Sequence, residues 1–363
     1  MMKSNRKWSI TFLSVVFFLI VGLGAVTVVI DPYFHYHAPL DSLEYLIDDE
    51  RYQNDGIMKH FKYDAILTGT SMTENFKTSE FDRLFHVNSI KVPFSGASYK
   101  EVNENLERAV EANPDIQLII RGIDYNALED SKDSIRYPTE FYPVYLYDNK
   151  LYNDVKYILN KSILFNSTLY VLEYTNAGNK TTNFDSYMNW NSRFDFGKDA
   201  VNSAYRRSEK ADITAEMTNE DYQKLQEHLQ QNIIQLVKQN PQIDFYLFFT
   251  PYSIYYWDSL NQSGMLKRQL KLEKEAIEAL LPYDNLYLFS FFDEFNMICD
   301  LNNYRDIVHY GEHINSQILS WMRNKEHLLT EKNYQEYCDK VYKFYTTYDY
   351  DALFYMDSKI TKN

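Results

Sequence analysis

Residues 64–71 read Asp-Ala-Ile-Leu-Thr-Gly-Thr-Ser, a short apolar run that ends in a glycine followed by two hydroxyl residues. A run of this length that is bounded by turn residues predicts a buried β-strand. In open parallel sheets, reactive groups collect at the carboxyl ends of the strands. Ser71, which directly follows this strand, is therefore a candidate nucleophile, although a Gly-Thr-Ser turn is also a common helix cap.

Apolar runs alternate with helical patterns along most of the chain. We predict strands at 65–68, 89–94, 118–120, 243–249 and 286–290, and helices at 74–84, 99–112, 219–239, 264–281 and over most of 312–345. Strands that alternate with helices of this length predict a mostly parallel sheet with right-handed crossovers. The expected fold class is α/β, a three-layer α/β/α domain with a parallel five-stranded sheet.

The N-terminus carries a membrane-anchor pattern. Lys3, Arg6 and Lys7 precede an uncharged run from Trp8 to Ile30, which would span roughly 34 Å as a helix against a hydrocarbon core of about 30 Å. The run is longer than the apolar core of a cleaved signal peptide. Basic residues before a span hold the N-terminus inside, so we expect one retained transmembrane helix with the remaining chain extracellular.

We divide the chain into four parts. Residues 1–30 form the signal anchor, 31–60 a juxtamembrane connector, 61–325 the α/β domain and 326–363 a C-terminal helical extension. Residues from about 130 to 215 are rich in Tyr, Asn, Asp and Ser with weak periodicity, which predicts an inserted subdomain or lid.

The connector contains two histidines, His35 and His37, in the aromatic sequence Asp31–His37. Histidine is a common metal ligand, but no third ligand is suggested nearby. We favour an aromatic collar just outside the bilayer, and predict no metal site and no cofactor.

Composition excludes one class of function and leaves two questions open. A net charge of −14 argues against nucleic-acid binding, which requires a basic surface. The 33 Tyr and 23 Phe residues suit a sugar-binding cleft or a membrane-facing surface, although nucleotide bias would produce them equally. Cys299 and Cys338 can form one disulfide or remain reduced.

An acid and a base lie near the end of the α/β pattern. Asp306 and His309 are separated by one helical turn, after the last predicted strand. Earlier, Gly96 and the stretch from Gly122 to Asp124 each follow a predicted strand, as Ser71 does. These positions together resemble the SGNH/GDSL hydrolase superfamily over roughly residues 61–325. The resemblance implies that Ser71, Asp306 and His309 form a catalytic triad, and that the backbone N–H groups of Ser71 and Gly96 belong to the oxyanion hole.

The segment from Gly122 to Tyr125 departs from the sequence motif of that superfamily. It is expected to read Gly-x-Asn-Asp, with an Asn side chain that donates to the oxyanion, but here it reads Gly122-Ile123-Asp124-Tyr125. An ionised Asp cannot donate a hydrogen bond. Asp124 therefore has another part, such as substrate binding, and either Asn126 or a backbone N–H supplies the donor.

An aromatic group follows the fourth strand at the same predicted sheet edge. Tyr252, Tyr256 and Trp257 are either a sugar-stacking platform or packing beneath the insertion, and the sequence favours neither.

A rival motif runs from His309 to His313. It matches the H-x-x-E-H pattern of inverted zinc peptidases. That site needs both histidines on a regular helix, which Gly311 disfavours.

The segments Asp31–His37, Tyr63–Phe76 and Tyr304–Asn315 look like those of membrane-anchored SGNH proteins of low-GC Gram-positive bacteria. These are similar to the D-alanyl-transfer and polysaccharide O-acetylation factors that act beside membrane-bound O-acyltransferases. The resemblance implies acyl transfer of an acetyl or D-alanyl group to a cell-envelope polysaccharide or teichoic acid. A carbohydrate or lipid esterase, and a non-catalytic polymer- or partner-binding scaffold, are the alternatives.

Overall fold

The computed structural model describes residues 2–138, 142–148 and 150–354. Residues 355–363 of the predicted C-terminal extension, and 139–141 and 149 of the predicted insertion, lie outside them. The chain divides into two compact units. Unit 1 comprises Met1–Lys62, Arg108–Pro114 and Tyr137–Met188, and unit 2 comprises Tyr63–Glu107, Asp115–Arg136 and Asn189–Asn363.

Unit 2 is built on a six-stranded sheet with the order β2-β1-β3-β4-β5-β6. The strands are β1 Ala65–Gly69, β2 Ser89–Pro93, β3 Leu118–Ile123, β4 Asp244–Phe249, β5 Leu286–Ser290 and β6 Leu328–Leu329. The first five pair in parallel, as the sequence predicts. The prediction of five strands was nevertheless wrong, because β6 adds a short antiparallel strand beside β5. A two-residue strand is too short to show a period-2 pattern.

Burial explains why the strands read as apolar runs. Every residue of β1, β2 and β3 is buried, as expected for parallel strands covered on both faces. Two charged residues stand among them. Arg121 in β3 donates to the backbone carbonyls of Asn232 at 2.8 Å and Tyr99 at 3.0 Å, and Lys91 Nζ in β2 donates to those of Glu74 at 2.5 Å and Phe76 at 2.8 Å. The bonds of Lys91 tie the turn after β1 to the neighbouring strand, because a buried ammonium group must be hydrogen-bonded.

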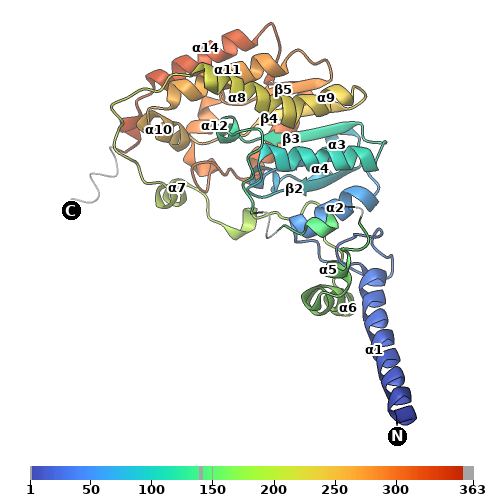
Figure 1. Cartoon of the computed structure of the whole chain (residues 1–363). Helices are drawn as coiled ribbons and strands as arrows, with labels where there is room; N and C mark the ends of the chain where they lie inside the picture. The colour runs from blue at the N-terminus through green and yellow to red at the C-terminus, as the bar shows by residue number, and fades with distance from the viewer. Residues whose placement is uncertain (1, 139–141, 149, 355–363) are drawn as a thin grey trace, which may run out of the picture. The chain divides into compact units, whose positions relative to one another are not determined.

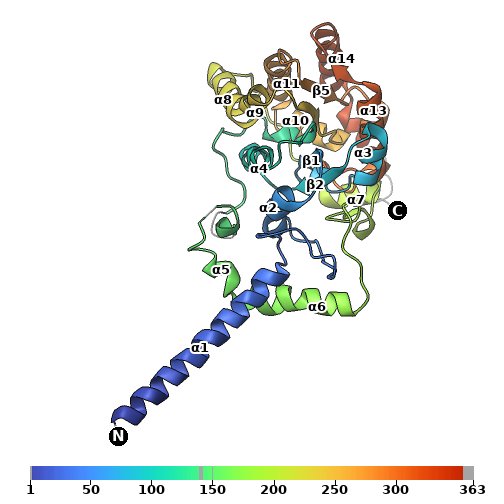
Figure 2. The ribbon, with the colours of Figure 1, turned by 90° about the vertical axis from the view of Figure 1, so that its right-hand side faces the viewer.

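Helices cover both faces of the sheet. Helix α3 packs against α13 on one face, whereas α8 and α14 pack against α11 on the other (Figures 1 and 2). The helices are α3 Thr78–Phe85, α4 Tyr99–Ala112, α7 Lys198–Ala204, α8 Asn219–Leu229, α9 Gln235–Gln239, α10 Ile254–Gln262, α11 Leu266–Leu280, α12 Phe295–Cys299, α13 Glu312–Asn324 and α14 Tyr334–Thr347.

Helix boundaries differ from the prediction where local chemistry intervenes. Helix α3 begins at Thr78 rather than Glu74, because a 3-10 turn, η1 Ser71–Thr73, follows β1. The region predicted as helical from 312 to 345 is divided by β6. Cys299 and Cys338 are both free thiols.

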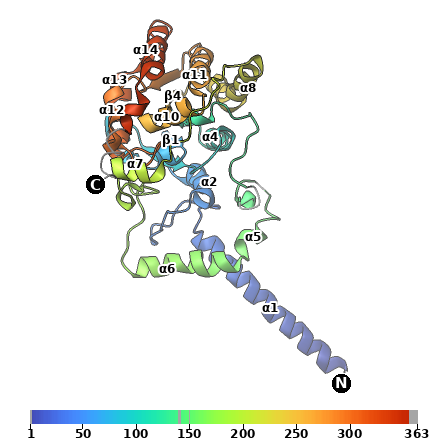
Figure 3. The same ribbon diagram turned by 90° about the vertical axis from the view of Figure 1, so that its left-hand side faces the viewer.

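Unit 1 contains the N-terminal helix α1 Met2–Ile30, which from Arg6 to Ile30 is long and apolar enough to cross a membrane. The predicted connector includes a helix, α2 Glu50–His60, which Asp49 caps by accepting from the backbone N–H of Tyr52. Helices α5 Val155–Ile158 and α6 Leu169–Asn176 complete the unit (Figure 3). The predicted insertion is thus divided, since Tyr137–Met188 belongs to unit 1 and the chain from Asn189 belongs to unit 2.

The aromatic sequence after α1 folds around the carboxylate of Asp31. This carboxylate accepts the backbone N–H groups of His35, Tyr36 and His37 at 2.7–3.1 Å and the hydroxyl of Tyr157 at 2.6 Å. The described residues contain no group of three or more His, Cys, Asp and Glu side chains placed to hold a metal ion. The collar outside the bilayer stays a prediction.

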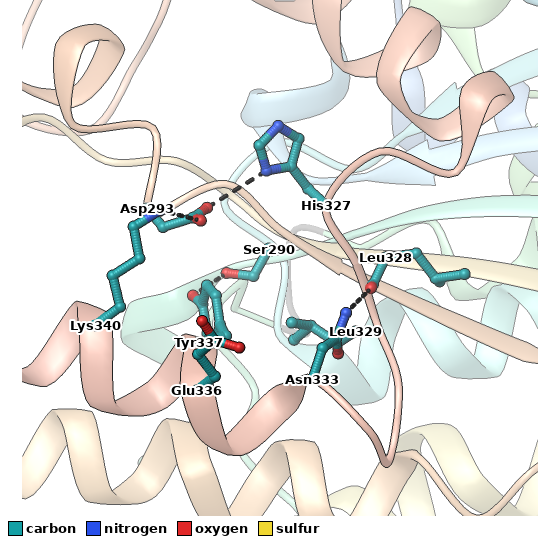
Figure 4. Close-up of a pocket in the computed structure, with 9 residues that line it drawn as sticks. All are labelled: Ser290, Asp293, His327, Leu328, Leu329, Asn333, Glu336, Tyr337 and Lys340. Atoms are coloured by element: carbon teal, nitrogen blue, oxygen red, sulfur yellow. Dashed lines mark hydrogen bonds and ion pairs between the residues drawn. The ribbon is translucent and has the colours of Figure 1, made fainter.

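A small cavity of about 210 Å³ lies in unit 2 where β5, β6 and α14 meet (Figure 4). Ser290 and Tyr337 both line it, their hydroxyls lie 2.5 Å apart, and Tyr337 donates to the buried carboxylate of Glu273 at 2.7 Å. Tyr125 donates to the other oxygen of Glu273 at 3.0 Å. Burial raises the pKa of Glu273 from 4.5 to about 7, against the lowering effect of the hydrogen bonds from Tyr337 and Tyr125.

The raised pKa of Glu273 predicts how the free energy of unfolding changes with pH. A carboxyl whose pKa is raised by folding stabilises the fold fully below the unfolded pKa, and that contribution is lost as the pH rises through the folded pKa. Between about pH 4.5 and about pH 7.5, the wild type should lose on the order of 3 kcal/mol relative to Glu273→Gln. Thermal unfolding of the full chain in detergent across this range measures the difference. Glu278→Gln, a more exposed position on α11, is the control, and a pH-independent gap for Glu273→Gln would contradict the assignment.

Candidate active site

Strand β1 presents Ser71 at the carboxyl edge of the sheet. Gly69 ends the strand with φ +151°, and a Cβ there would lie 2.6 Å from the side chain of Thr73 and 3.3 Å from the backbone nitrogen of Gly122. Only glycine fits this turn without displacing its neighbours. Thr70 then caps η1 by accepting from the backbone N–H of Met72, so Ser71 becomes the first residue of the turn with its side chain partly exposed.

Asp306 and His309 lie on a closed loop rather than on a helix. One carboxylate oxygen of Asp306 accepts the backbone N–H groups of Val308 at 2.9 Å and His309 at 2.8 Å. The N–H of Arg305 donates to the carbonyl of His309 at 3.0 Å. The three-residue spacing of the acid and the base is held by a loop, because these hydrogen bonds satisfy its backbone, and the helix begins only at Glu312.

The loop joins the three predicted residues in one chain of hydrogen bonds. His309 Nε2 lies 2.9 Å from Ser71 Oγ, and His309 Nδ1 lies 2.8 Å from the second carboxylate oxygen of Asp306. A carboxylate accepts only, so Nδ1 carries the proton and Nε2 is left as the acceptor for the Ser71 hydroxyl. Burial alone would raise the pKa of Asp306, but the hydrogen bond and charge of His309 and the backbone N–H donors hold it below its usual value. Asp306 is therefore ionised at neutral pH.

Gly96 and Asn126 lie at the ends of the strands on either side of β1. Gly96, with φ +66°, is in the turn after β2, and Asn126 is in the 3-10 turn Tyr125–Ala127 after β3. The side-chain oxygen of Asn126 accepts the hydroxyl of Tyr252 at 3.2 Å. That bond uses the amide oxygen, so the amide N–H groups remain as donors.

Asp124 links the end of β3 to the turn that carries Ser71, through hydrogen bonds with Thr70. The hydroxyl of Thr70 lies 2.9 Å from each of its carboxylate oxygens, and Tyr99 donates to its backbone carbonyl at 2.8 Å. Burial raises the pKa of Asp124 against the opposing effect of the Thr70 hydrogen bond. This buried, bonded carboxylate favours a role in holding the Ser71 turn over direct contact with a substrate.

The aromatic residues after β4 are covered. Tyr252, Tyr256 and Trp257 are 2%, 7% and 0% exposed, and Trp257 stacks on Tyr345 with ring centroids 3.7 Å apart. A sugar-stacking platform needs an open ring face, so the geometry favours the packing alternative. Tyr252 still touches the site through its hydrogen bond to Asn126.

Trp190 belongs to the site but was not predicted. Its indole N–H donates to the carbonyl of Ser71 at 3.3 Å, and its ring meets the imidazole of His309 edge-on at 5.6 Å. The indole also stacks on the ring of Phe196, with ring centroids 6.1 Å apart. This tryptophan stands in a stretch without periodicity, so only its composition could have drawn attention to it.

Arg305 adds the second unpredicted feature. Its guanidinium lies 3.6 Å from the ring centroid of Phe194 and 5.2 Å from that of Trp190, and it lies 3.3 Å from the carboxylate of Asp306. An open cleft of about 720 Å³ adjoins these groups. It is lined by Phe194, Asp195, Phe196, Asp199, Ala200, Ser203, Ala204, Arg305 and Asp306. Aromatic walls with a few charged groups suit a polar ligand with apolar faces.

The zinc-peptidase motif does not have the required geometry. His309 is on the loop, whereas His313 is on α13 and hydrogen-bonds to Asn303 at 2.9 Å. Glu312 is ion-paired with Lys77. The two histidines therefore do not share a regular helix.

Comparisons with known proteins give little help. No family model matches the sequence, and no curated protein matches it. One solved structure, described as a proposed platelet activating factor from Streptococcus pneumonia, is similar over 76% of this chain and 90% of its own length. Its sequence identity is 12% and its TM-score is 0.37, which is too low to support a conclusion about this chain.

The Thr70–Asp124 bond gives a stability prediction. Thr70→Val should lower the free energy of unfolding by about 1–3 kcal/mol, because it leaves a buried acceptor unsatisfied. Thr70→Ser keeps the hydroxyl and is the matched control. Thermal unfolding of the full chain in detergent compares the three proteins, and equal stability of the Val and Ser variants would show that the bond contributes nothing.

Proposed function

We propose that this chain is an extracytoplasmic serine acyltransferase, which moves an acetyl or D-alanyl group onto a cell-envelope polysaccharide or teichoic acid through a Ser71 acyl-enzyme. The observation that carries the proposal is the hydrogen-bonded chain from Ser71 through His309 to Asp306. A serine hydroxyl becomes an effective nucleophile only when an adjacent base takes its proton, and this geometry supplies that base.

The first half-reaction forms the acyl-enzyme. Ser71 Oγ attacks the carbonyl carbon of the donor as its proton passes to His309 Nε2. Asp306 stabilises the resulting imidazolium and fixes the tautomer. The leaving group then departs with the proton from His309, and the acyl group remains on Ser71 as an ester.

The tetrahedral oxygen needs hydrogen-bond donors. We assign the backbone N–H groups of Ser71 and Gly96 and the side-chain amide of Asn126, which Tyr252 orients through its bond to the amide oxygen. Asn126 would thus replace the Asn of the Gly-x-Asn-Asp motif, which this chain lacks. The loss of one such donor typically costs about 3–4 kcal/mol in the transition state.

The second half-reaction transfers the acyl group. A sugar or polyol hydroxyl gives its proton to His309 and attacks the ester, and Ser71 leaves with that proton. Arg305 and the cleft beside Asp306 would bind the acceptor or the donor, since they lie next to the base and the cleft is open, whereas the buried Trp190 packs against His309. A membrane-bound O-acyltransferase could present the donor beside the α1 anchor, with the N-terminus cytoplasmic and unit 2 outside.

The nucleophile is tested by labelling the full-length chain in detergent with a fluorophosphonate and weighing the intact protein. We expect one adduct on the wild type and on Ser95→Ala, and none on Ser71→Ala. Asp306→Asn should slow labelling by about 100-fold or more, because the imidazole loses its fixed tautomer. His313→Gln is the matched histidine control and should label normally. A folded wild type that resists labelling would favour the non-catalytic scaffold instead.

Transfer is distinguished from hydrolysis by following the acyl group. With radiolabelled p-nitrophenyl acetate as donor, teichoic acid or cell-wall polysaccharide should accelerate p-nitrophenol release and take up the label. Ser71→Ala should abolish both effects. Label found only in free acetate, with no acceleration by either polymer, would identify an esterase.

A further inference from the structure

Unit 1 exposes a set of large apolar side chains between Leu151 and Leu172. They lie in the turn before helix α5, on α5 and at its C-cap, on the π-helical turn η5 Ile163–Thr168 and on helix α6. Leu151, Tyr152, Val155, Leu159, Phe165, Tyr170 and Leu172 are 80%, 79%, 52%, 47%, 55%, 40% and 36% exposed, respectively. We call this set the outer apolar surface. Apolar exposure that is gathered within one short segment marks a candidate surface for contact with another apolar phase.

The spacing shows that this exposure is organised. Phe165, Leu169 and Leu172 recur at helical intervals along η5 and α6, so they lie on one side of the helix. Ile163, Leu164, Thr168 and Val171 are buried on the other side. Val155 and Leu159 are likewise exposed on α5, whereas Tyr157 is fully buried. Each segment therefore buries apolar side chains on one side, and it exposes further apolar side chains on the other side.

The buried side attaches these helices to the N-terminal anchor. A Cβ on Gly24 of α1 would lie 2.7 Å from the side chain of Ile158, so α5 packs tightly on α1. Tyr157 donates to Asp31 at 2.6 Å, directly beyond the end of α1. Helix α1 contacts both α5 and η5 (Figure 3).

The position of the α5 contact along α1 indicates how deep in the membrane α5 would lie. Gly24 lies about 9 Å before the end of the helix at Ile30, measured along its axis. The apolar run of α1 continues without a charged residue to Ile30. Interfacial amphipathic helices bury their apolar side about 5–10 Å into the headgroup and acyl boundary. The α5 contact is therefore at the depth of an interfacial helix if α1 crosses the bilayer.

We infer that the outer apolar surface is embedded in the outer leaflet of the membrane that α1 spans. Helix α1, which contacts α5 and η5, itself exposes Leu23, Val26 and Val29, and these apolar side chains on the adjoining helix favour a lipid phase over a separate protein partner. Lys156 and Lys161 are exposed on the same segment, where their ammonium groups can reach lipid phosphates. This gives unit 1 two membrane attachments, so it cannot tilt freely about α1.

The test places a fluorophore at the outer apolar surface of the full-length chain in phosphatidylcholine–phosphatidylglycerol vesicles. Leu151→Cys, Phe165→Cys and Leu172→Cys are each made in a Cys299→Ser, Cys338→Ser background and labelled with NBD. Val29→Cys on α1 is the membrane standard. Ile213→Cys in unit 2, an apolar position that is 71% exposed, is the control for water exposure. Circular dichroism and thermal unfolding confirm that each variant is folded.

We expect the three surface labels to emit at shorter wavelength than the Ile213 label and to resist quenching by iodide. Lipids with a doxyl group near the headgroup should quench them more strongly than lipids with a doxyl group deep in the acyl chain. Labels that behave like the Ile213 label would overturn the inference. Labels that are shielded from iodide but not quenched by either lipid would also overturn it, and would indicate a protein occupant such as a second copy of the chain.

Discussion

The carboxylate of Asp306 is the group on which the candidate site depends. One of its oxygens closes the loop by accepting the backbone N–H groups of Val308 and His309, and the other fixes the imidazole of His309. The same side chain therefore shapes the loop and selects the tautomer that leaves Nε2 free to accept from Ser71. The hydrogen bonds that stabilise the carboxylate also keep its pKa low, so its charge is present whenever the base is to act.

A second carboxylate holds the other half of the site. Asp124 is buried against Thr70, the residue between the strand-ending Gly69 and Ser71. By our proposal, the side-chain donor to the oxyanion is Asn126, two residues further along the chain. Trp190 packs against the imidazole of His309, and the guanidinium of Arg305 lies over the ring of Trp190.

The sequence predicts most of the scaffold because the parallel strands are buried on both faces and read as apolar runs. The family resemblance also singled out Ser71, His309 and Asp306, which the structure joins in one chain of hydrogen bonds. The sequence does not predict β6, which has two residues, or the loop of Asp306, whose backbone is satisfied by a side chain. Trp190 is missed because its contacts with Ser71 and His309 are made in three dimensions by a stretch without periodicity. For Tyr256 and Trp257, the sequence leaves open a sugar-stacking platform or packing, and their burial in the structure favours packing.

The most direct measurement of the central claim is an experimental structure of the full-length protein after reaction with a fluorophosphonate. If Ser71 is the nucleophile, the density is continuous from Ser71 Oγ to phosphorus, and His309 is still bound to Asp306. The phosphonyl oxygen should lie within hydrogen-bond distance of the Ser71 and Gly96 N–H groups and the Asn126 amide. An adduct on another residue, or a phosphonyl oxygen directed away from all of these donors, would contradict it.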